Sequence, residues 1–336
     1  MSEKYGEALS IARSEDEKQE IYEKYILGKP EPIESKLAVE PVLRAAVLSL
    51  VASGFARTEE SLLDFFANSF WGYQYKDIFG LRRKLTSILK KLEQYGFIKI
   101  ERWLLPTTLG RRISELYLDP ESAHHIITGL KNAEIRTPAF AFLHLIAGTV
   151  EIGSPLRPRK SDFEEIQEKM LKYESSLLVP LPKEWDIAYE LFVASFKTAM
   201  MLQDWADERS EEYVLEQYRI RPGELYGRLT NADWLLYSAQ ELARILSLKE
   251  IQTPIIKTRL RLKYGIREEL LPLVKLKNIG RVRARRLYGA GLTSLATLKR
   301  APVEKLVRLL GTKLAADVRR QLGLEVEETK KGQLKF

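Results

Sequence analysis

The sequence predicts a mainly α-helical protein that is built from several consecutive folded parts. Apolar residues recur at helical spacing through most of the chain, and few stretches have the pattern of strands. With 336 residues, the chain is too long for one ordinary domain. A hydrophobic content of 45% and a charged content of 30% are typical of a folded, soluble protein. We therefore expect two or three domains, most of them helical.

Composition excludes several classes of protein and site. The chain has no cysteine, which excludes disulfides, thiolate zinc sites and a cysteine nucleophile, and which suits an intracellular protein. No apolar run reaches the ~20 residues that a membrane-spanning helix needs. The first residues lack the basic and then apolar pattern of a secretory signal. We expect a cytoplasmic, nucleoid-associated protein with no membrane partner.

Positive charge is concentrated near the C-terminus. Residues 256–320 contain 18 Lys and Arg but only 4 Asp and Glu. Residues 1–255 contain 33 Lys and Arg and 39 Asp and Glu. A focus of positive charge attracts polyanions, of which nucleic acid is the commonest inside a cell. A solvated surface with no ligand is the alternative interpretation of the same charge.

Residues 1–37 have the pattern of a segment that belongs to something upstream. Residues 5–12 are a candidate short strand, although a strand this short needs a sheet to join. A charged helical stretch follows, and then a turn or linker at residues 28–32, which contain one Gly and two Pro.

Residues 38–118 predict a winged helix. Helices are expected over residues 40–54, from the N-cap Thr58, and over residues 76–95, followed by strands at residues 97–100 and 103–105. Three helices followed by a two-stranded hairpin is the order of a winged helix, and another helix starts at Thr107. The third helix has basic residues that could meet a major groove: Arg82, Arg83, Lys84, Lys90 and Lys91. A sequence-specific winged-helix regulator is therefore an alternative function.

Residues 119–255 predict a helical bundle. Candidate helices are residues 120–132, 137–149, 161–173, 185–208, 210–218 and 223–248. The last of these has Trp234 in its middle, with Arg228 six residues earlier. A tryptophan here is either a core residue or a platform on which a nucleic-acid base stacks. The sequence leaves both interpretations open.

Residues 256–323 predict a small helix-hairpin-helix domain. A helix that contains Leu270, Leu271 and Val274 is expected to end near Lys277, and a turn at Asn278, Ile279 and Gly280 opens the next helix. A glycine and free N–H groups at a helix start let a phosphate approach the backbone. Cations surround this turn and a second half-hairpin at residues 309–315: Arg281, Arg283, Arg285, Arg286 and Lys313. The competing interpretation is an ordinary helical turn with a glycine.

No motif predicts chemistry carried out by this chain alone. The chain lacks GxxxxGK[ST], HExxH and the order of a Ser-His-Asp triad, and His124, His125 and His144 lack metal-site spacing. We therefore expect no metal ion and no cofactor in the chain itself. Its status as an enzyme stays open.

Several segments together resemble one known family. They are residues 5–8, 25–37, 107–116 and 139–147, Asp204-Trp205, and residues 261–270 leading into the hairpin motif. The pattern is similar to the C-terminal half of Hjm, an archaeal superfamily II DNA helicase related to the helicase part of DNA polymerase theta, and it covers nearly all of the chain. The family acts in DNA repair, recombination and replication restart. The resemblance implies a fragment or split gene product without the RecA-like motor domains that bind ATP and Mg²⁺.

The resemblance also implies roles for residues. Such helicases move 3′ to 5′ along one strand, and a ratchet helix, here residues 223–248, contacts successive bases, with Trp234 as the stacking residue. The family's arginine about two turns earlier falls on Gly227, so Arg228 or Arg221 is the candidate replacement. The hairpin domain, through Arg281, Arg283 and Arg285, guides the leaving strand. The implied partners are single-stranded and forked DNA and an upstream motor. Separately, residues 331–336 of the flexible tail at residues 324–336 are faintly similar to tails that bind a sliding clamp, although the usual spacing and paired aromatics are missing, so a sliding clamp is one further candidate partner.

Overall fold

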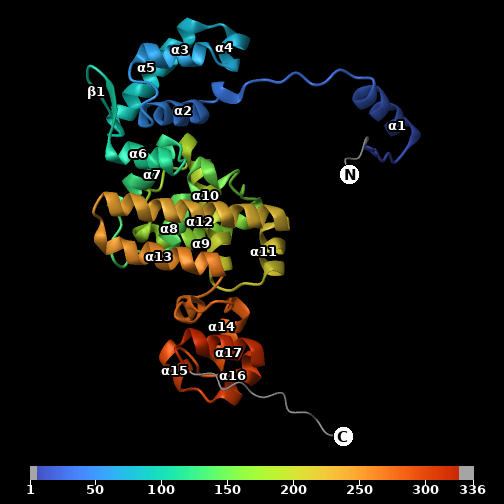
Figure 1. Cartoon of the computed structure of the whole chain (residues 1–336), viewed down its shortest axis with the longest axis vertical. Helices are drawn as coiled ribbons and strands as arrows, with labels where there is room; N and C mark the ends of the chain where they lie inside the picture. Colours follow the sequence, from blue (N-terminus) through green and yellow to red (C-terminus); the bar gives the residue numbers. More distant parts are fainter. Residues whose placement is uncertain (1–5, 325–336) are drawn as a thin grey trace.

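The computed structural model describes residues 6–324 and confirms the mainly α fold. Three lobes follow one another along the long axis of the molecule, and an N-terminal extension runs away from the first (Figure 1). We call them the N-terminal lobe (residues 36–118), the helical bundle (residues 119–264) and the C-terminal lobe (residues 265–324). Tyr5 and residues 325–336, which include the ending with a faint similarity to clamp-binding tails, lie outside the described residues.

The N-terminal extension contains helix but no strand in its described part. Residues 6–12 have no regular secondary structure, so the predicted strand is wrong for these residues, which have no neighbouring strand with which to pair. Helix α1 (Glu15–Ile21) and a π-helical turn η1 (Tyr22–Ile26) follow. The chain then reaches the N-terminal lobe, where the Gln74 side chain accepts a hydrogen bond from the Ser35 N–H and donates one to the Ile33 carbonyl.

The N-terminal lobe has the predicted order of helices followed by a hairpin, plus one short helix that the sequence reasoning missed. Its elements are η2 (Lys36–Ala38), α2 (Glu40–Ala52), α3 (Glu59–Ala67), α4 (Phe70–Tyr75), α5 (Ile78–Gln94), β1 (Ile98–Ile100), β2 (Leu104–Pro106) and α6 (Thr108–Glu115). Thr58 caps α3 as expected, because its hydroxyl accepts the Ser61 N–H at 3.1 Å. Helix α5 starts later than predicted, since Lys76 has φ +53° and the Asp77 carboxylate caps the helix. The strands pair antiparallel, with Ile98 opposite Pro106.

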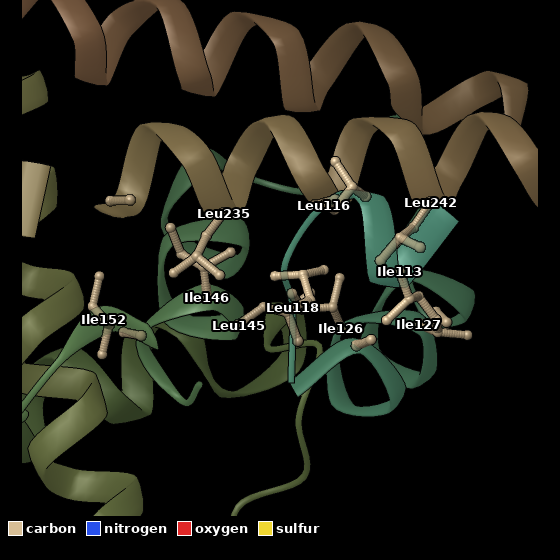
Figure 2. Close-up of a cluster of buried hydrophobic side chains, with 14 of the residues drawn as sticks. Ile113, Leu116, Leu118, Ile126, Ile127, Leu145, Ile146, Ile152, Leu235 and Leu242 are labelled. Atoms are coloured by element: carbon tan, nitrogen blue, oxygen red, sulfur yellow. The ribbon is translucent and has the colours of Figure 1, made fainter. Parts of the chain in front are cut away.

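The helical bundle packs around helix α8, which is buried from Phe140 to Ala147. Its elements are α7 (Pro120–Lys131), α8 (Ala139–Ala147), η3 (Val150–Ile152), η4 (Lys160–Asp162), α9 (Phe163–Tyr173), η5 (Glu174–Ser176), α10 (Ile187–Ala206), α11 (Glu211–Tyr218), α12 (Pro222–Ile245) and α13 (Lys249–Tyr264). Figure 2 shows Leu235 and Leu242 of α12 above apolar side chains from α6, α7 and α8. The N-terminal lobe and the bundle therefore share one hydrophobic core. Helix α13 runs across the predicted boundary between residues 255 and 256, and its Ile251, Ile255 and Leu262 belong to this core.

A buried ion pair also joins the N-terminal lobe to the bundle. The Arg44 guanidinium on α2 donates to both carboxylate oxygens of Asp119, at 3.1 and 2.8 Å, and both residues are 5% exposed. Glu40 and Glu121 lie 3.1 and 2.5 Å from the remaining guanidinium nitrogen. Burial lowers the pKa of Arg44, but the hydrogen bonds and the negative charge of Asp119 raise this pKa by more, so the net shift is upward.

The C-terminal lobe has a core of its own, which begins at Ile266. Its elements are η6 (Glu268–Leu270), η7 (Leu273–Lys275), α14 (Arg281–Gly289), α15 (Leu295–Arg300), α16 (Val303–Leu310) and α17 (Thr312–Gln321). The helix predicted through Leu270, Leu271 and Val274 is wrong, because two separate 3-10 turns occupy this stretch. Pro272 lies between the turns, and it lacks the N–H that a continuous helix would need there.

Candidate nucleic-acid interface

Helix α12 presents an aromatic and polar stripe on its exposed side. At about 100° per residue, Tyr226, Thr230, Tyr237 and Arg244 all point within about 40° of one another. Tyr226 is 74% exposed, Thr230 and Arg244 are exposed, and Tyr237 is half-buried. The Arg259 guanidinium of α13 lies 4.9 Å from the Tyr237 ring centroid. The two cations are paired with carboxylates, Arg244 with Glu241 and Arg259 with Asp233. The aromatic rings are the part of the stripe on which the bases of a single strand could stack.

Trp234 lies at the edge of this stripe, beside the N-terminal lobe. It is half-buried, and its indole N–H donates to the Leu116 carbonyl at 3.1 Å. About two turns later α12 is tied to the same lobe, because Arg112 contacts Glu241 at 2.7 Å. The pKa of the Glu241 carboxyl is lowered by hydrogen bonds from Arg244 and Arg112. Trp234 therefore has a structural partner in addition to any base that would stack on it, and both interpretations of the residue stay open.

The structure separates the two arginines predicted near Trp234 from that residue. Arg228 lies about 120° round α12 from Trp234. Its guanidinium donates to the Ser154 carbonyl at 2.9 Å, and its side chain is 14% exposed. Arg221 is exposed at the N-cap of α12, roughly 20 Å along the axis from Trp234 at 1.5 Å per residue. Gly227 does share the face of Trp234, and a Cβ there would meet nothing within 4 Å.

The predicted turn at residues 278–280 lies directly before α14. Asn278 has φ +65°, Ile279 is buried and anchors the turn, and Gly280 is the exposed N-cap of α14. A cleft of about 410 Å³ opens at this turn, with Lys275, Lys277 and Arg283 among its lining residues. The first N–H groups of a helix lack partners inside the helix, and they carry a partial positive charge. The sequence-predicted turn therefore exists, and cations border it.

Three of the predicted cations remain exposed around the two turns. Arg283 donates to the Asn278 carbonyl at 2.8 Å, and Arg286 donates to the Leu309 carbonyl at 3.2 Å, next to the second turn. That second turn contains Gly311, with φ +82°, and it opens α17, whose second residue is the exposed Lys313. Within residues 6–324, Arg283, Arg286 and Lys313 form no ion pair. Their charges are available to a polyanion.

Arg281 and Arg285 point elsewhere, toward the bundle. Arg285 forms ion pairs with Glu208 and with Glu269, the latter at 2.8 Å. Arg281 donates to the Arg209 carbonyl at 2.6 Å, and it is half-buried. Sequence reasoning placed both arginines on DNA and missed their partners, because nothing in the local pattern shows which residues more than 70 positions away will lie beside them. Their role in DNA binding stays a prediction.

The histidines are placed as structural residues in the described part of the chain. His144 is 2% exposed, its Nε2 lies 3.2 Å from the Ser195 hydroxyl, and burial lowers its pKa to about 4. His125 contacts the Leu145 carbonyl through Nε2, and His124 stacks on Tyr95. Among residues 6–324 no cluster of three metal-ligating side chains is present. In the same range, no helix combines the length and the apolar character needed to cross a bilayer.

Comparisons with known proteins confirm the resemblance to archaeal DNA helicases. The family described as "Archaeal helicase, domain 4" matches residues 140–265, which include the aromatic stripe of α12. The chain is 36% identical over 332 residues to the ATP-dependent DNA helicase Hel308 of Methanocella arvoryzae, with 97% of this chain and 44% of that protein covered. It is 36% identical to Hel308 of Thermococcus kodakarensis (96% and 29% covered) and 33% identical to Hel308 of Pyrococcus abyssi (98% and 47% covered). The chain thus spans less than half the length of these curated relatives.

Proposed function

We propose that the chain, nearly all of which is homologous to archaeal Hel308 helicases, is the DNA-binding C-terminal module of an ATP-dependent 3′–5′ DNA helicase. Its substrates in this proposal are forked or branched DNA during repair, recombination and replication restart. RecA-like motor domains are its partners, and they supply ATP and Mg²⁺ chemistry. The module itself grips DNA and performs no covalent step.

The observation that carries the proposal is the pair of basic turns in the C-terminal lobe. The Asn278–Gly280 turn presents the free N–H groups of α14, and Arg283, Arg286 and Lys313 lie exposed without carboxylate partners in the described structure. Such turns bind the sugar-phosphate backbone and read no bases. The aromatic stripe of α12 supplies the second element, because base stacking tolerates any sequence. Together they suit a protein that moves along a strand.

Salt dependence of binding by two single variants tests this proposal. On single-stranded DNA, each cation that neutralises a phosphate contributes about 0.7 to the slope of log affinity against log salt. Arg283→Ala and Arg286→Ala should therefore each weaken binding and lower the slope by about 0.7. Lys131→Ala, which removes an exposed cation from α7 of the bundle, is the matched control and should change neither quantity. Unchanged affinity and slope in both arginine variants would refute the proposed contact between the two basic turns and DNA.

A second candidate function has a specific observation in its favour. Helix α5 of the N-terminal lobe exposes Arg83, Lys84 and Lys90, none of which forms an ion pair within residues 6–324. A winged-helix regulator would insert this helix into a major groove and prefer duplex DNA. Arg83→Ala would then remove discrimination between two duplex sequences, whereas the helicase-module proposal expects no discrimination in the unmodified chain.

The N-terminal extension favours a third function, a scaffold that docks a motor or sliding clamp. Leu9, Ile11 and Ile33 are each at least 78% exposed, and Tyr25 and Leu27 are exposed as well. A scaffold would co-purify with a separate ATPase and would bind DNA weakly by itself. Strong binding of the purified chain to DNA contradicts this alternative.

A further inference from the structure

A six-residue segment of the bundle, residues 204–209, receives arginines from both sides of the junction with the C-terminal lobe. It consists of the last three residues of α10 and the first three of the turn that leads to α11, and it includes Trp205, Asp207 and Glu208. Glu208 has φ +69°, a conformation that costs free energy for a residue other than glycine. The surrounding contacts must therefore stabilise the turn in this form.

Arg285 of α14 lies between two carboxylates from different lobes. Its guanidinium contacts both oxygens of Glu208 in the bundle and Glu269 in the C-terminal lobe. The hydrogen bonds with Glu208 raise the pKa of Arg285, and those with Glu269 add to the effect. Because Glu208 and Glu269 approach one guanidinium from two lobes, the three charges bridge the junction.

Arg281, one turn earlier on the same face of α14, makes the second contact. Its guanidinium lies 5.3 Å from the Trp205 ring centroid and donates to the Arg209 carbonyl at 2.6 Å. Trp205 is itself fixed, because its indole N–H donates to the Leu262 carbonyl at 2.9 Å. A Cβ added at Gly265 would lie 3.0 Å from the Trp205 ring, so the ring packs closely against the backbone that connects the lobes.

Two further arginines lie close to Gly265, where the bundle continues into the C-terminal lobe, and both contact Asp207. Arg261 contacts the Asp207 carboxylate at 2.6 Å, and Arg267 donates to the Asp207 carbonyl at 3.2 Å. By contrast, Arg283 is about 200° round α14 from Arg281 and is exposed. Helix α14 thus directs one pair of arginines at the bundle and leaves Arg283 and Arg286 toward solvent.

We infer that Arg281 and Arg285 are positioning residues and are not ligands of DNA phosphates. Their contacts hold the C-terminal lobe against residues 204–209, and we call this set of contacts the latch. The latch fixes the direction in which the two basic turns face relative to the stripe on α12. Its consequence for DNA rests on the proposed function, whereas the latch itself does not. Loss of the latch frees the lobe to rotate about the connection near Gly265.

Charge reversal across the latch tests the inference without DNA. The chain has no cysteine, so Lys131→Cys and Lys299→Cys, both at exposed positions, can carry a donor and an acceptor dye on the bundle and the C-terminal lobe. Arg285→Glu faces Glu208 and Glu269 with a third carboxylate, and Glu208→Arg faces Arg285 with a second cation. Each should shift or broaden the interdye distance distribution.

The double variant, Arg285→Glu with Glu208→Arg, supplies the control against misfolding of the single variants. It exchanges the charges of residues 208 and 285, so that these two residues attract each other again while Glu269 still faces a carboxylate at position 285, and it should shift the distribution part of the way back to the original. Single variants with the original distribution, or a double variant that restores nothing, would overturn the latch.

DNA binding gives a second, independent readout. Arg285→Ala should change the interdye distance but leave the salt slope of single-strand binding as it is, while Arg283→Ala should lower the slope by about 0.7 and leave the distance unchanged. Equal losses of slope in both variants would show that Arg285 is a phosphate ligand and would refute its positioning role. If the unmodified chain bound no DNA, the proposed function would fail and the distance measurement would still decide the latch. Glu208→Gln, which removes the charge but keeps the shape, should give a partial distance change.

Discussion

Removal of Arg44 should destabilise the shared core of the N-terminal lobe and bundle more than any surface substitution. Arg44→Met keeps most of the side-chain volume but leaves the Asp119 carboxylate buried without its guanidinium partner. Breaking one side of a buried ion pair costs about 3–5 kcal/mol, because the remaining charge is uncompensated. The backbone N–H of Asp119 donates to the Glu151 carboxylate at 2.7 Å. This neighbouring carboxylate repels the charge of Asp119 and cannot replace the guanidinium. We therefore expect a loss at the upper end of that range.

Urea unfolding followed by tryptophan fluorescence measures this loss selectively. All five tryptophans precede residue 256, so their signal reports chiefly the N-terminal lobe and bundle, although Trp205 also lies beside Arg281 of the C-terminal lobe. The double variant Arg44→Met, Asp119→Leu removes both charges and should be more stable than Arg44→Met alone. A loss below about 1 kcal/mol in the single variant, or a double variant that is less stable than either single one, would refute the reasoning.

Three further predictions concern individual side chains. His144 has a folded-state pKa of about 4, below its ordinary value of 6.5, so the unfolded chain binds the proton first and stability should fall as pH decreases from 6.5 to 4. The loss is about 3 kcal/mol at most, and urea unfolding at several pH values should show that His144→Gln lacks this component. Trp234→Phe removes the hydrogen bond to Leu116 and should cost about 1 kcal/mol of stability with little change in single-strand affinity, while Trp234→Ala should also weaken that affinity by about 1–3 kcal/mol. Equal affinity of the folded Ala variant would assign Trp234 to the core alone. Gly227→Arg adds a cation on the face of α12 that carries Trp234, where a side chain meets open space. Anisotropy titrations should show tighter single-strand binding and a salt slope steeper by about 0.7. Unchanged binding would show that this face of α12 does not contact DNA.

The helical layout was predictable because it depends on local patterns. Apolar spacing located most helices within a few residues, and Thr58 capped α3 as its chemistry required. Errors occurred where short polar or cyclic side chains decide the backbone. Asp77 moved the start of α5, and Pro272 replaced an expected helix with two 3-10 turns.

The candidate site was predictable only in part, because charge in a sequence does not reveal its partners. Arg281, Arg283 and Arg285 alternate along α14 and looked equivalent, yet the helix sends Arg281 and Arg285 to the bundle and Arg283 to solvent. Arg228 was similarly ambiguous until the fold placed it beside Ser154. Contacts between residues far apart in the chain decide both cases, and no local period encodes them.

The most direct test of the central claim is binding of the unmodified chain to three DNAs at two salt concentrations. Fluorescence anisotropy should compare a single strand, a forked duplex and a blunt duplex at about 50 and 200 mM salt. If Arg283, Arg286 and Lys313 each neutralise one phosphate, log affinity for the single strand should fall with log salt at a slope of about −2. The account predicts that slope, with the single strand and the fork bound more tightly than the blunt duplex. Tighter binding to the blunt duplex, or affinity that does not change with salt, would contradict it.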